Sequence, residues 1–69
     1  MSDTILKALH ELLLDYGLQL KVVEAEIVRR ARRGETVESL GKIIGKAKFL
    51  KELQKECVMK MANFGNKKN

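Results

Sequence analysis

The side chains that could take part in nucleophilic or acid–base chemistry are few in this 69-residue sequence. His10 has charged helical neighbours but no accompanying nucleophile, so we interpret it as a surface histidine rather than a catalytic base. Cys57 lies among apolar residues, where a buried thiol is unreactive. Glu24 and Glu26 point to different faces of a helix and do not form an acid–base pair. We therefore predict that the protein is not an enzyme.

A metal site, a disulfide and a membrane-directed segment have equally little support in the sequence. Cys57 and His10 are the only soft metal ligands in the sequence, whereas a zinc site requires about four ligands. A single cysteine cannot form a disulfide within one chain, and an unpaired thiol is typical of a reducing cytoplasm. Charges interrupt every apolar run in the first twenty residues, so we expect neither a signal peptide nor a membrane span. We predict a cytoplasmic protein with no metal and no cofactor.

Basic side chains are concentrated in one segment. Residues 29–48 contain seven basic and two acidic side chains, a net charge of +5, whereas the rest of the chain has seven of each and is neutral. Such a cluster attracts anions, and nucleic-acid phosphates are the partners that we expect. Aromatic side chains for base stacking and known nucleic-acid-binding motifs are both missing, so binding should have little sequence preference. The predicted anion-binding residues, called the basic cluster below, are Arg29, Arg30, Arg32, Arg33, Lys42 and Lys46.

Two other readings of this segment stay open. The basic cluster could bind a different anionic partner, or it could be a solvated helix end whose arginines favour the negative end of the helix dipole. The stretch from Arg29 to Leu40 also resembles the junction between the first and second helices of the Hha/YmoA nucleoid-associated regulators. The resemblance covers 12 of the 69 residues, and the histidine and tryptophan of the later family pattern are missing, so we do not transfer the family's function.

The basic cluster lies where two predicted helices meet. Apolar residues recur every three or four positions from Ile5 to Ile27, which is the spacing of one helix face. Gly34 supplies the left-handed residue that commonly ends a helix, and Thr36 can cap a second helix. We predict an all-α antiparallel helical hairpin with helices 3–33 and 36–64, a single domain over residues 1–64, and a disordered basic tail at residues 65–69.

Three glycines inside the predicted helices require an interpretation. Gly17 could end the first helix early, but the apolar stripe keeps its phase across it, so we predict one continuous helix. Gly41 and Gly45 are four residues apart on one helix face, which permits close helix packing. The alternative at this pair is a close approach by a ligand phosphate or another backbone.

The first helix has more apolar surface than one neighbouring helix can cover. Fifteen of the 24 residues from Ile5 to Val28 are apolar, whereas three or four per two turns are enough for one neighbour. We therefore predict a homodimer that forms a four-helix bundle, or a higher helical oligomer. A different protein could cover the same surface. The predicted interface residues are Leu6, Leu9, Leu13, Leu14, Tyr16, Leu18, Leu20, Val23 and Ile27.

These features together predict a small non-enzymatic regulatory or accessory protein of bacterial, phage or plasmid origin. We expect it to dimerise through its leucine-rich face and to bind a nucleic-acid backbone with the basic cluster. One alternative is a helical inhibitor or adaptor that binds a larger protein through helix-face contacts. Another is an oligomer that sequesters an anionic, nucleotide-like ligand.

Overall fold

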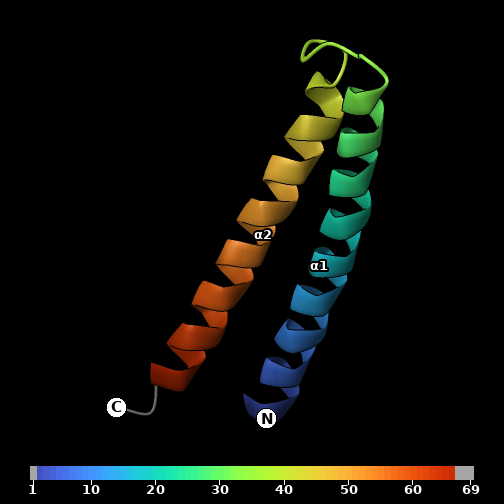
Figure 1. Ribbon diagram of the computed structural model, residues 1–69. Helices are drawn as coiled ribbons and strands as arrows, with labels where there is room; N and C mark the ends of the chain where they lie inside the picture. The colour runs from blue at the N-terminus through green and yellow to red at the C-terminus, as the bar shows by residue number, and fades with distance from the viewer. Residues whose placement is uncertain (1, 67–69) are drawn as a thin grey trace.

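The computed structural model describes residues 2–66, including the side chains of residues 3–64. Two helices, α1 (Ser2–Arg32) and α2 (Gly41–Asn66), lie antiparallel and side by side (Figure 1). A turn joins them at one end of a rod that measures 52 × 16 × 12 Å, and Ser2 and Asn66 lie at the other end. The predicted all-α hairpin is confirmed, whereas its assembly with a second chain stays a prediction.

α1 is continuous across Gly17, as predicted. A Cβ atom at this position would lie 3.5 Å from Nε2 of Gln54, which is an ordinary van der Waals distance. Gly17 therefore lies where α1 faces α2. The glycine does not break the helix, because packing against α2 supports the backbone on both sides of it.

α1 ends in a Schellman motif around Gly34, which has a φ angle of +93°. The N–H of Gly34 donates to the carbonyl of Ala31 at 3.0 Å, and the N–H of Glu35 donates to the carbonyl of Arg30 at 3.3 Å. These two bonds satisfy carbonyls that have no helical partner in the last turn. The predicted role of Gly34 as a helix stop is confirmed.

The second helix begins five residues later than predicted, at Gly41 rather than at residue 36. Thr36 still caps the segment that follows it, because its Oγ1 accepts a hydrogen bond from the N–H of Ser39 at 3.2 Å. The N–H of Gly41, however, donates to the carbonyl of Glu38, three residues earlier, at 3.2 Å, and residues 37–40 form turns. Val37, which would lie in the first turn of the predicted helix 36–64, is instead 75% exposed in this turn.

The far end of α2 also differs from the prediction. The helix continues to Asn66, two residues beyond the predicted end at residue 64. The other residues of the predicted tail, 67–69, lie outside the described residues. The core is one narrow strip between the two helices, and no described side chain is less than 2% exposed. Its buried members are Leu20, Val23, Leu40, Ala47, Leu50 and Cys57.

Candidate functional site

Arg30, one of the six residues of the basic cluster, is held by Glu35 inside the turn. Its Nε lies 3.1 and 3.0 Å from the two carboxylate oxygens of Glu35, and its Nη2 donates to Oε1 at 2.8 Å. Both side chains are 29% exposed. They occupy the two positions of the Schellman motif that are usually joined by an apolar contact, so an ion pair replaces that contact here.

The electrostatics of this pair stabilise its charged form. The hydrogen bond from Arg30 lowers the pKa of the Glu35 carboxyl below its usual value of 4.5, and the same bond raises the pKa of Arg30. Ser39 Oγ lies 3.2 Å from Oε1 of Glu35, which further favours the carboxylate. Arg30 thus closes the turn between the helices and is already occupied by an internal anion.

The other members of the basic cluster are more accessible to a ligand. Arg29 forms an ion pair with Glu26 but remains 62% exposed. No ion pair occupies the remaining four within the described part of the chain, and all four are exposed: Arg32, Arg33, Lys42 and Lys46.

Only part of the basic cluster lies at the turn end of the hairpin. Arg32 is the last residue of α1, and Arg33 follows it directly. Ile44 lines a groove with Ile27 and Val28, so Lys42, two residues before it, lies at the level of the last turns of α1. Lys46, by contrast, lines a different groove with Gln19 and Val23, which precede Arg32 by about 14–20 Å along the helix.

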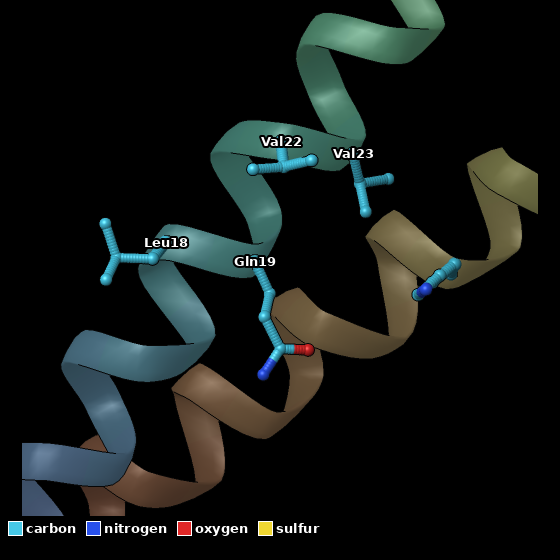
Figure 2. A pocket seen from close by; sticks show the side chains of 5 residues that line it. Leu18, Gln19, Val22 and Val23 are labelled. Carbon is cyan, nitrogen blue, oxygen red and sulfur yellow. The ribbon is translucent and has the colours of Figure 1, made fainter.

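A row of exposed aliphatic side chains follows the side of α1 that faces away from α2. Leu14, Leu18 and Val22 are spaced four residues apart and are 67%, 66% and 71% exposed. Figure 2 shows Leu18 projecting away from α2, whereas Val23 points toward it. We call these three residues, Leu14, Leu18 and Val22, the apolar ridge.

The predicted oligomer interface divides into three sets in the structure. Leu20 and Val23 are buried against α2, and Tyr16 and Ile27 pack against the same core. Leu14 and Leu18 are free of the hairpin core and belong to the apolar ridge. Leu6, Leu9 and Leu13 are half-buried. The predicted interface did not include Val22, although its four-residue spacing from Leu18 places both residues on the same face of the helix.

The two glycines predicted at a close helix contact do not make one within the hairpin. A Cβ atom at Gly41 or Gly45 would meet nothing within 4 Å. Both residues are exposed, so close packing at this pair would require a second molecule.

The two candidate chemical side chains are placed as the sequence suggested. His10 is exposed beside a shallow groove of about 540 Å³. Cys57 is 4% exposed, and its Sγ donates a hydrogen bond to the carbonyl of Leu9 at 3.0 Å. Between residues 2 and 66, no group of three or more His, Cys, Asp or Glu side chains is arranged to hold a metal ion.

Neither described helix has the combination of length and apolar composition needed to cross a membrane. Comparisons with family models, with curated proteins and with solved structures give no match for this chain. The charges at the turn and the apolar ridge on α1 are therefore the features from which a function can be inferred.

Proposed function

We propose that this chain is a small, non-enzymatic accessory protein that associates with itself and binds the phosphate backbone of a nucleic acid. The exposed basic residues at the turn end supply the phosphate contacts. The leucine-rich surface of α1 supplies the contact between chains. The unpaired, buried thiol of Cys57 is compatible with the reducing cytoplasm in which we place the protein.

The exposed area of the hairpin supports self-association. A folded monomer of this mass, 7.8 kDa, exposes about 4,400 Å² of surface, whereas this chain exposes 5681 Å². The difference exceeds the area of about 800 Å² that each partner buries in an interface of standard size. Covering the apolar ridge would remove part of this excess from water.

The distribution of charge is the observation that carries the nucleic-acid proposal. The entire net charge of +5 resides in residues 29–48, and Arg32, Arg33 and Lys42 are exposed at one end of the rod. Lysine and arginine side chains bind phosphates and displace condensed counterions, so affinity for a polyanion falls as salt rises. Phosphate contacts of this kind do not read the base sequence.

Salt titration of binding to a random-sequence duplex tests this proposal. We expect the logarithm of the binding constant to fall linearly with the logarithm of salt concentration, with a slope of about −0.9 for each phosphate contact. Arg33→Gln should remove one phosphate contact and make the slope shallower by about 0.9. Lys55→Gln, an exposed lysine on α2 far from the turn, is the matched control and should leave the slope unchanged. Absence of binding to duplex DNA and to RNA at about 50 mM salt would refute the proposal.

The apolar ridge favours a second candidate, a helical inhibitor or adaptor that binds a larger protein. An exposed aliphatic row on one helix face is the type of surface that packs in the groove of a partner. This function predicts that a specific protein co-purifies after nuclease treatment. Its capture should be lost with Leu18→Asp but retained with Arg33→Gln, which is the reverse of the result expected for nucleic acid.

A further inference from the structure

Among the exposed apolar side chains of the described residues, those of the apolar ridge form the most continuous surface. Leu14, Leu18 and Val22 follow each other at single-turn spacing. On α2, Phe49, Val58 and Met59 are 62%, 50% and 57% exposed, but Phe49 lies nine residues before Val58, with charged side chains between them, and Val58 and Met59 are consecutive, so they point to different sides of the helix. The apolar ridge is thus the face of the hairpin that most needs a partner.

We propose that a second copy of this chain docks on the apolar ridge, with the two α1 helices antiparallel and related by a two-fold axis at Leu18. This inference rests on the self-association in the proposed function, and it adds the face, the orientation and the register. In this register Leu18 packs against its own copy, and Leu14 of one copy packs against Val22 of the other. Each ridge can enter the groove beside the opposing ridge.

The charges along α1 favour a second copy in this orientation. The part of α1 before Leu18 carries three acidic residues and one lysine, a net charge of −2. The part after Leu18 carries four basic and two acidic residues, a net charge of +2. Antiparallel pairing about Leu18 places each negative half on a positive half, whereas parallel pairing would oppose like charges.

One groove beside the ridge opens on a flank of the proposed interface. This groove has a volume of about 290 Å³ and is lined by Leu18, Gln19, Val22, Val23 and Lys46 (Figure 2). Asp15 lies on the same flank of α1, because Nε2 of Gln19 donates to its Oδ2 at 3.1 Å. The two-fold axis keeps equal flanks together and sets Asp15 of the second copy at the level of this groove. Asp15 of the second copy therefore adds a carboxylate to the flank of the interface on which this groove opens.

Measurement of the mass in solution tests the docking face. Wild-type protein at micromolar concentration should have twice the chain mass of 7.8 kDa by light scattering, and Leu18→Asp should have the mass of one chain. Val37→Asp is the matched control, because Val37 is 75% exposed in the turn, away from the ridge, and this variant should remain a dimer. Circular dichroism at 222 nm should show unchanged helicity in both variants, because neither side chain contributes to the buried core.

Cysteine cross-linking tests the orientation. With Leu14 opposite Val22, the double variant Leu14→Cys/Val22→Cys should form a covalent dimer on mild oxidation. Leu14→Cys alone should not, because the two copies of residue 14 would be about 12 Å apart along the helix, beyond the reach of a disulfide. Wild-type protein controls for Cys57, which is 4% exposed and should not cross-link.

The outcomes separate the two levels of the proposal. A dimeric Leu18→Asp variant would overturn the docking face, and a covalent dimer of Leu14→Cys alone would overturn the antiparallel orientation. Both results would leave self-association intact. A monomeric wild-type protein would instead contradict the self-association on which the inference rests, while the salt titration would still decide nucleic-acid binding independently.

Discussion

The same substitution, glycine to alanine, should have opposite effects at two positions of this hairpin. Gly34 has a φ angle of +93°, in the left-handed region, and an added Cβ would meet nothing within 4 Å. The cost of Gly34→Ala is therefore backbone strain without a steric clash, about 1 kcal/mol. Gly45 lies inside α2 and has equally open space, so Gly45→Ala should stabilise the helix by about 0.5–1 kcal/mol.

Thermal unfolding followed by circular dichroism measures both effects. For a chain of this size a change of 1 kcal/mol shifts the Tm by about 4–8 °C. We expect the Tm to fall by about this amount in Gly34→Ala and to rise by several degrees in Gly45→Ala. All samples must have the same protein concentration, because self-association makes the Tm concentration-dependent.

Two results would refute this reasoning. A Gly34→Ala variant as stable as the wild type would show that α1 does not end in the left-handed motif. A Gly45→Ala variant less stable than the wild type would show that the space beside Gly45 is filled. In the second case the contact would come from another molecule, because the hairpin places nothing there.

Further predictions concern the turn, the basic cluster and the buried thiol. The folded-state pKa of Glu35 is lowered, so the stabilising effect of its carboxylate is fully present above the usual pKa and is lost as the pH falls through the folded-state pKa. The difference in Tm between wild type and Glu35→Gln should therefore be largest near neutral pH and should disappear between about pH 5 and pH 2. Arg30→Gln should reduce the slope of the salt titration less than Arg33→Gln, since Glu35 already occupies Arg30; equal reductions would show that a phosphate displaces the carboxylate. Cys57 should react with a thiol reagent far more slowly in native protein than in denaturant, and equal rates would contradict its burial.

The two helices and the end of α1 were predictable, because strong local signals specify them. The apolar spacing identified both helices, and Gly34 marked the end of α1 through a conformation that other residues rarely adopt. The start of α2 was not predictable from Thr36 alone. The threonine does cap the turn, but Glu35 is drawn back to Arg30, and regular helical bonding begins only at the carbonyl of Leu40. The bidentate ion pair is a three-dimensional contact that spacing does not show.

The residues of the candidate site were predictable from the sequence, but which of them are free to bind a ligand was not. Counting charges located the excess at the hairpin end, yet it could not show that Arg30 is occupied or that Lys46 lies beside Gln19. The count of apolar residues in the sequence showed that α1 has more of them than one neighbouring helix can cover. Which of them remain exposed depends on the rotation of α1 about its axis, and the structure shows that α2 covers Leu20 and leaves Leu18 open.

The position of the charge at one end of a long rod has a consequence for the length of duplex that a dimer can bind. In the antiparallel dimer the two copies of Arg32 would be about 42 Å apart along the helix direction, which corresponds to about 12 base pairs of DNA. A shorter duplex would touch one end, whereas a longer one would reach both. The second contact would form at a high effective concentration, so affinity should increase abruptly with duplex length near this value.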